Sequence, residues 1–428
     1  MSYLNDIEKL VSSDKWDYYK CHNKKTIRRI LQDPKGFINN TFITAKKKDL
    51  VDNCTNAPNI SEARAAHSIS SYFLGFRLAE GLIEKHLNDF CAIKNTKLDF
   101  AYVWYLTSLY HDFGYCYERD ESFVDQMYQS VSKNWEKGSN NYFYSTLYHL
   151  KKCRQLSIKH SIWNVNYFHR GCDEEDKVEK SLDQEIEDYV KENYCNLVCN
   201  GNSVSMPMRS SRIVRCYLNY RLLSDNKRRR IDHGVCGGLV FYDKLFKNYI
   251  KAYKRVKRDT PHVSLKMFFE RDNGRAIKFS LDQIVVFMYV ADCIINHNIW
   301  KAKHSEEQLY KDFKLEALIG ENFEKINFYK NPLLFILALS DTLEPYKSFF
   351  AVKHSGKRID DIGYSVEDVL SAFEDFDICI SIDKIVIKVP EILRDECRKT
   401  LTGMEDWIDI QVEEKDNFII SMLKKEKC

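Results

Sequence analysis

The chain has 428 residues and a formal net charge of +3, and 44% of its residues are hydrophobic. This size and composition exclude an intrinsically disordered protein and a small domain that depends on disulfides, and the near-neutral charge argues against a nucleic-acid coat protein. Only 15 Gly and 7 Pro interrupt the chain, which favours a mainly helical architecture.

The N-terminal sequence MSYLNDIEKL is polar and mixed, and no run approaches the roughly 18 apolar residues of a membrane span. We therefore expect no signal peptide, no membrane contact and a cytoplasmic location. In that compartment the 14 Cys would be reduced thiols. Association into a homo-oligomer is left open.

Residues 1–60 predict an irregular N-terminal region with short helices. A regular helical periodicity begins after it. Ser61 is a suitable N-cap for a long amphipathic helix whose apolar residues recur at helical spacing. The stretch 101–112 is apolar on all sides and predicts a central helix. The following segment, about 118–230, is the least regular. We interpret it as an insertion with some helix, in which the polar stretch 199–205 forms a loop.

Three more helices are predicted after the insertion. Asp232 is a suitable N-cap for the first helix, and Ser280 for the second, over 280–300. Pro332 suits the first turn of the third, over 332–346.

Beyond residue 346 the pattern changes. A helix is predicted over 366–376, and 377–389 alternates with a period of two, which predicts a hairpin with its turn near 382–384. A further helix and two strands follow. The predicted fold class is therefore mainly α: a helical body over 61–346 and a small α+β domain over 347–428.

Metal-type ligands lie on five apolar segments of the helical body. A single His on an apolar face is more often a hydrogen-bonded core residue, and a single Asp could cap a helix or pair with an Arg. Together, this many buried polar groups without partners would cost several kcal/mol. A shared metal centre removes that cost, so the set indicates a metal site more strongly than any one member. The candidate ligands are His67, His111, Asp112, His233, His297 and Asp341.

The order His, His-Asp, His, His, Asp resembles the HD-domain superfamily of metal-dependent phosphohydrolases, an all-helical family, over about 61–346. The resemblance also implies a second metal, held by His233 and His297. Asp112, the Asp of the adjacent pair His111-Asp112, would bridge it to a first metal. The donor types do not distinguish Mn, Fe, Zn, Ni and Mg. The resemblance implies that the first divalent metal is held by His67, His111, Asp112 and Asp341.

The chain departs from the family pattern at two places. Many members read HDxGK, with a basic residue that aids catalysis, whereas this chain reads HDFGY. Tyr115 stands in that place and is a candidate catalytic residue together with Asp112. Some two-metal members have paired histidines where this chain has His297 and Asn298.

Basic residues near the candidate ligands point to a phosphate substrate. Arg64 precedes His67 by about one helical turn and could reach a phosphate, or pair instead with Glu62 or another acid. A basic run before the predicted His233 helix would suit a nucleotide or an oligonucleotide, or form only a solvated helix face. This run consists of Arg228, Arg229 and Arg230.

We therefore expect a metal-dependent phosphohydrolase that cleaves a phosphate ester of a nucleotide-type substrate with metal-activated water. Phosphodiesterase, nuclease and nucleotide phosphohydrolase activities all fit. Two alternatives stay open. The chain could be a regulatory or sensor protein with a structural metal site and a C-terminal interaction module. It could also carry out redox chemistry at a mixed-valent iron pair.

Overall fold

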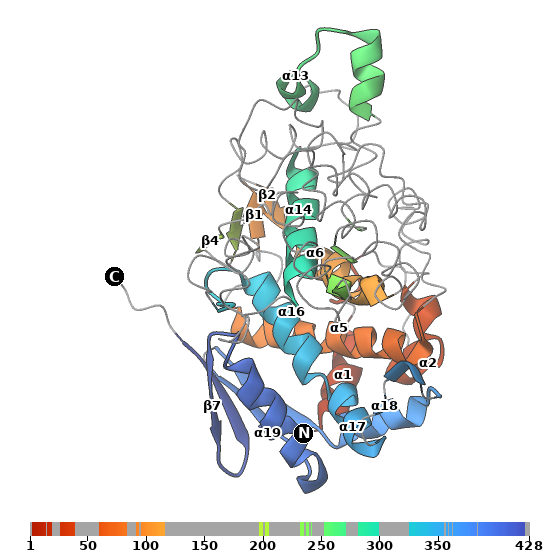
Figure 1. The fold of residues 1–428 in the computed structure, drawn as a ribbon, viewed down its shortest axis with the longest axis vertical. Helices are drawn as coiled ribbons and strands as arrows, with labels where there is room; N and C mark the ends of the chain where they lie inside the picture. The colour runs from red at the N-terminus through yellow and green to blue at the C-terminus, as the bar shows by residue number, and fades with distance from the viewer. Residues whose placement is uncertain are drawn as a thin grey trace, which may run out of the picture. The chain divides into compact units, whose positions relative to one another are not determined.

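The computed structural model describes these parts of the chain: 2–13, 15–18, 26–38, 60–83, 91–93, 96–115, 197–199, 202–204, 232–234, 237–238, 241, 252–270, 281–298, 325–354, 357, 359–361, 363–382 and 384–423. Helices dominate these residues (Figure 1). The chain divides into two compact units. The first comprises Met1–Phe113, Asn196–Ser205 and Lys325–Cys428, and the second comprises Gly114–Cys195 and Met206–Glu324. The domain limits inferred from the sequence stay predictions.

The longest described helix of the first unit is α5 (Glu62–Leu82). Ser61 is its N-cap and accepts a hydrogen bond from the Arg64 N–H at 3.2 Å, as predicted. The helix is not amphipathic, however, because other elements of the unit surround it and bury nearly all of its side chains. Ser70 and Ser71 are small enough to be buried where a surface helix would carry charged groups.

The predicted central helix is confirmed as α6 (Phe100–Ser108), which packs against α5. It is shorter than predicted, and His111–Gly114 form a separate 3-10 turn, η3. The reason is local. The Nδ1 atom of His111 binds the Ser108 carbonyl at 2.5 Å, which is the acceptor that the N–H of Asp112 would need to continue the helix. His111 and Asp112 therefore lie in a turn beyond the helix.

A third helix, α16 (Pro332–Leu343), also packs against α5 and has Pro332 in its first turn, as predicted. The predicted helix over 332–346 is interrupted at Glu344, because Pro345 begins a second helix, α17 (Pro345–Lys353). Glu344 is the N-cap of α17, and its carboxylate accepts hydrogen bonds from two backbone N–H groups of the first turn.

The C-terminal segment forms the predicted α+β arrangement. Its four-stranded antiparallel sheet has the order β5 (Asp377–Ser381), β6 (Lys384–Lys388), β8 (Phe418–Met422) and β7 (Ile410–Glu414). Two helices accompany it, α18 (Val366–Glu374) and α19 (Glu391–Met404), and α19 lies along the sheet (Figure 1). The period of two in β6 places Ile385 and Ile387 in the core.

The N-terminal helices pack against the C-terminal α+β segment in the first unit. The N-terminal helices α1 (Tyr3–Ser12) and α2 (Ile27–Gln32) both contact α18. The Tyr3 N–H donates to the Phe376 carbonyl at 2.9 Å, and the Tyr3 ring meets Phe376 edge-on. The short helices predicted before residue 60 are thus present, and they complete the core beneath the C-terminal elements.

The stretch 199–205, predicted as a loop, instead contributes to a second small sheet. Its strands have the order β2 (Thr96–Leu98), β1 (Cys91–Ile93), β3 (Leu197–Cys199) and β4 (Asn202–Val204), and all pairs are antiparallel. Strands of three residues carry too little alternation to be recognised in the sequence. Backbone pairing with a distant strand stabilises them here.

The second unit contains α13 (Leu265–Glu270) and α14 (Leu281–Asn296). The latter confirms the predicted helix over 280–300 and is almost wholly buried, whereas its proposed cap Ser280 lies outside the described residues. Asp232 accepts a hydrogen bond from the Gly234 N–H at 2.7 Å, as an N-cap would. Among the described helices, none combines the length and the apolar run needed to cross a bilayer.

Candidate metal centre

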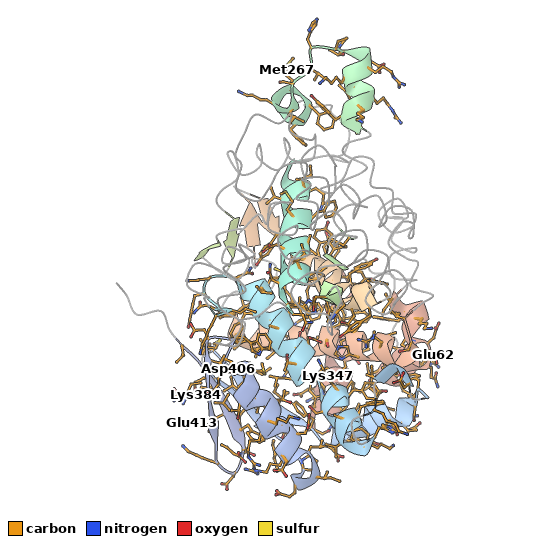
Figure 2. All side chains as sticks on the ribbon, in the orientation of Figure 1. Glu62, Met267, Lys347, Lys384, Asp406 and Glu413 are labelled. Atoms are coloured by element: carbon orange, nitrogen blue, oxygen red, sulfur yellow. The ribbon has the colours of Figure 1, made fainter. Side chains whose placement is uncertain are left out.

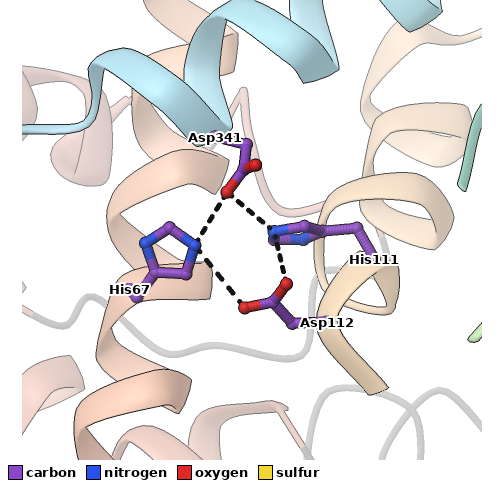
Figure 3. Close-up of side chains that lie close together, drawn as sticks. All are labelled: His67, His111, Asp112 and Asp341. Carbon is purple, nitrogen blue, oxygen red and sulfur yellow. Dashed lines mark hydrogen bonds and ion pairs between the residues drawn. The ribbon is translucent and has the colours of Figure 1, made fainter. Parts of the chain in front are cut away.

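Four of the predicted ligands meet in the first unit (Figure 3). His67 comes from α5, His111 and Asp112 from η3, and Asp341 from α16. One potential ligand atom of each lies within 4.8 Å of those of all the others. Packing of α6 and α16 against α5 brings the three segments together, so residues far apart in the sequence form one cluster.

The distances within the cluster match the spacing of atoms around one ion. The Nε2 atom of His67 lies 2.9 Å from Asp341 Oδ1 and 3.5 Å from Asp112 Oδ2. The Nε2 atom of His111 lies 3.3 Å from Asp112 Oδ1 and 3.5 Å from Asp341 Oδ1. Ligand atoms about 2.0–2.2 Å from a common ion, at angles of about 90–110°, would lie about 2.8–3.6 Å from one another. These distances lie in that range, and the four residues could hold a divalent ion.

Hydrogen bonds on the outer side orient both imidazoles. The Nδ1 atom of His111 faces the Ser108 carbonyl, which can only accept, so Nδ1 carries the proton. The Nδ1 atom of His67 donates to Glu344 Oε1 at 2.8 Å. In the neutral rings the lone pairs on Nε2 then point at carboxylate oxygens. That arrangement is repulsive unless a cation lies between them, and it is the usual arrangement of histidines bound to a metal.

Glu344 is a functional residue that the sequence analysis missed. Its carboxylate is 0% exposed and joins the N-terminus of α17 to the imidazole of His67. A buried carboxylate is costly without such partners. A signal was present in the sequence, because Glu344 directly precedes Pro345 and lies three residues after the candidate ligand Asp341.

The pKa values of the cluster show how strongly it attracts positive charge. Burial by itself lowers the pKa of His67, but hydrogen bonds to Asp341 and Glu344 outweigh it and raise the pKa to about 9. Burial raises the pKa of Asp341, and the neighbouring Lys347, His111 and His67 more than reverse this, so the pKa lies well below its usual range. Without a metal, a proton on His67 supplies the missing charge.

Two cations flank the cluster. The guanidinium of Arg64 lies 3.2 Å from Asp112 Oδ2 and is 9% exposed, so its acidic partner is Asp112 rather than Glu62. The ammonium of Lys347 lies 3.6 Å from Asp341 Oδ1. Among the described residues, each aspartate thus has a basic neighbour, which offsets part of the cost of burying two carboxylates together.

The other two predicted ligands lie in the second unit. The Nε2 atoms of His233 and His297 are 3.2 Å apart, and His297 Nδ1 donates to the Ile294 carbonyl at 2.6 Å. The spacing suits two ligands of one ion, but a hydrogen bond from His233 Nε2–H to His297 Nε2 also satisfies this pair. The second metal and its bridge through Asp112 stay predictions.

Tyr115 lies in the same unit. It is the predicted catalytic residue that stands where the HDxGK pattern has a basic residue. Its ring stacks on the His233 imidazole, with centroids 3.8 Å apart and 12° between the planes. Gly114 allows this approach, because a Cβ there would lie 1.6 Å from the His233 carbonyl oxygen. The predicted substrate-binding residues of the basic run, Arg228, Arg229 and Arg230, lie outside the described residues.

In comparisons with protein-family models, curated proteins and solved structures, none matched the chain.

Proposed function

We propose that this chain is a divalent-metal-dependent phosphohydrolase of the HD type, which cleaves a phosphate ester of a nucleotide-type substrate. The observation that carries the proposal is the cluster of His67, His111, Asp112 and Asp341, in which two imidazole Nε2 atoms face two carboxylates at 2.9–3.5 Å. The same four residues stand at the metal-binding positions of the sequence pattern that resembles the HD-domain superfamily.

The charges at the site support an anionic substrate. Asp112, Asp341 and Glu344 contribute three negative charges, and Arg64 and Lys347 contribute two positive ones. With a divalent ion bound and His67 neutral, the charges of these five described residues and the ion sum to one positive charge. A partly buried positive centre attracts a phosphate group and stabilises negative charge that develops on it.

The residues have separable roles in this proposal. His67 and His111 would hold the ion through Nε2, while their Nδ1–H groups donate to Glu344 Oε1 and to the Ser108 carbonyl. Asp112 and Asp341 complete the site, and Arg64 restrains one oxygen of Asp112. When bound, a divalent ion would supply Lewis-acid charge that polarises a phosphoryl oxygen and makes a water more acidic. The nucleotide character of the substrate rests on Arg228, Arg229 and Arg230.

The proposal is tested with purified protein by measuring bound metal per chain and the hydrolysis products that form from a substrate panel. The panel contains dNTPs, 3′- and 5′-mononucleotides, cyclic mono- and dinucleotides, and single-stranded DNA and RNA. A cleaved phosphodiester gives a phosphomonoester and a hydroxyl group, whereas a cleaved monoester gives inorganic phosphate, so products are separated by chromatography. Wild type is compared with Asp112→Ala and with Asp395→Asn, a control in which an exposed aspartate of α19 loses its charge. We expect bound metal and hydrolysis of a panel member in wild type and the control, and neither in Asp112→Ala.

Other outcomes identify the alternatives. Wild-type protein that takes up no divalent ion contradicts the proposal. Metal uptake without hydrolysis of any panel member would favour the regulatory or sensor protein. A mixed-valent iron signal in electron paramagnetic resonance, without hydrolysis of any panel member, would favour the redox reaction.

A further inference from the structure

Lys347 lies on α17 (Figure 2), and its side chain is more exposed than those of the described charged residues with which it surrounds the candidate metal centre. The side chain is 51% exposed, whereas those of His67, His111, Asp112 and Asp341 are between 0% and 13% exposed and that of Arg64 is 9% exposed. A molecule that approaches from solvent could therefore meet Lys347 directly.

The ammonium group of Lys347 is directed at Asp341. Its Nζ atom donates to the Asp341 carbonyl at 3.2 Å and lies 3.6 Å from the Oδ1 atom of the same residue. That Oδ1 atom also faces Nε2 of His67 and Nε2 of His111. An ammonium has three donors, and the hydrogen bond to the Asp341 carbonyl uses one of them, whereas the 3.6 Å contact with Oδ1 is an ion pair, so the ammonium retains N–H donors for a further oxygen.

The backbone of Lys347 is fixed to the metal centre. Glu344 Oε1 accepts hydrogen bonds from both His67 Nδ1, at 2.8 Å, and the Lys347 N–H, at 2.6 Å. One buried carboxylate oxygen thus links a candidate metal ligand and the residue that carries the exposed cation. The base of the lysine side chain is held in place, while its flexible stem lets the ammonium adjust to a substrate.

We infer that Lys347 binds a phosphate oxygen of the substrate beside Asp341. The inference rests on the proposed function, because it assigns the phosphate-binding cation of that same site. Arg64 is suited to a different task, since it is buried and already holds a ligand oxygen of Asp112. In the resting protein, Lys347 neutralises Asp341. In the substrate complex, its ammonium donates a charge-assisted hydrogen bond to the phosphate.

The test measures the affinity of the metal-loaded protein for inorganic phosphate by calorimetry, together with its metal content and metal affinity. The variants are Lys347→Gln and Lys347→Arg. The matched control is Lys353→Gln, which removes the same charge from the same helix but from a lysine that pairs with Asp368 on α18. Its side chain is exposed to a similar degree, 44%.

We expect Lys347→Gln to raise the Kd for phosphate by about tenfold or more, which corresponds to about 1.4 kcal/mol, while metal affinity is unchanged or tighter. Lys347→Arg should keep most of the phosphate affinity, and Lys353→Gln should match wild type. Phosphate affinity of Lys347→Gln within about twofold of wild type would overturn the inference.

The inference and the proposed function can fail separately. Wild type that hydrolyses a panel substrate and binds phosphate, with no loss in Lys347→Gln, removes only the role of Lys347. Wild type that takes up metal but binds no phosphate and hydrolyses no panel substrate contradicts both. A Lys347→Gln protein that loses metal would show that the lysine supports metal binding by Asp341. This result also overturns the inference.

Discussion

His67 and Glu344 form a hydrogen bond of 2.8 Å between Nδ1 and Oε1, and both side chains are almost wholly excluded from solvent. The bond joins the second turn of α5 to the N-terminus of α17. It fixes the ring orientation of His67 and directs Nε2 toward Asp341 and Asp112. A carboxylate in this position raises the basicity of the imidazole that it orients.

Replacement of Glu344 should therefore weaken metal binding without removing any ligand. We expect Glu344→Ala to lower metal affinity by about 10–100-fold and Glu344→Gln to have a smaller effect, because the amide oxygen can still accept from Nδ1. The measurement is titration against a competing chelator. Glu367→Gln, which alters an exposed glutamate paired with Arg28 on α2, is the control and should leave metal affinity unchanged. Equal affinities for Glu344→Ala and the control would contradict this role.

The stability of the metal-free protein should fall as pH rises. The pKa of His67 is raised from 6.5 to about 9 in the folded state. A group whose pKa is raised by folding stabilises the folded state fully below its unfolded pKa, and this contribution is lost as pH passes the folded value. We expect the free energy of unfolding to fall between about pH 6.5 and pH 9, by at most about 3 kcal/mol.

A saturating divalent ion should remove this dependence, because the ion replaces the proton at Nε2 and its binding releases that proton. The measurement is denaturant unfolding with and without a chelator across this pH range. His67→Gln provides the control, since it should show no loss of stability in that window. A metal-free wild type that is equally stable at both ends of the window would be inconsistent with the charged His67.

Two substitutions of Tyr115 distinguish the contribution of its aromatic ring from that of its hydroxyl group. The stack on His233 depends on the aromatic face, which Phe retains and Ala does not. We expect Tyr115→Phe to keep most of the stability and phosphate release, and Tyr115→Ala to lose about 0.5–1.5 kcal/mol of stability together with activity. Calorimetric Tm values and initial rates provide the measurement. A Tyr115→Phe protein that is stable but inactive would instead assign the hydroxyl the catalytic role predicted from the sequence.

Two glycines should respond to Ala in opposite directions. A Cβ on Gly75 of α5 would lie 2.0 Å from Cζ2 of Trp104, so Gly75→Ala would push α6 away. We expect a loss of about 1–3 kcal/mol and weaker metal binding, because this contact sets the spacing of the segments that carry His67 and His111. A Cβ on Gly403 of α19 meets nothing within 4 Å. Gly403→Ala should raise the free energy of unfolding, by up to about 1 kcal/mol.

Chemical denaturation of the metal-free proteins measures both effects. Comparison with the metal-loaded proteins then shows whether the Gly75 variant also loses metal affinity, as the helix spacing predicts. A Gly75→Ala protein as stable as wild type would mean that the α5–α6 contact can relax.

Elements with a strong local signal were predicted well. The cap at Ser61, the first-turn Pro332 and the alternation of 377–389 all lie where the structure has them. The amphipathic character predicted for α5 was wrong, because a periodic pattern does not reveal how many elements surround a helix. The paired strands near residues 91 and 199 were missed, because three-residue strands depend on partners far away in the sequence.

The candidate ligands were predicted from residue type and from buried surroundings. The approach of His67, His111, Asp112 and Asp341 to one another is now observed. Glu344 and Lys347 were not among the predicted site residues, since a glutamate before a proline and a lysine on a helix are ordinary in a sequence. Their roles depend on the side chains that face them, His67 on α5 for Glu344 and Asp341 on α16 for Lys347.

By itself, the sequence determined which residues could bind a metal and that they would be buried, because hydrophobic periodicity and donor chemistry are properties of short segments. Tertiary structure alone decided which nitrogen of each imidazole faces the centre and which cation flanks each aspartate. Those features depend on hydrogen-bond partners contributed by other elements, and the distances between elements are set by packing, as where Gly75 meets Trp104.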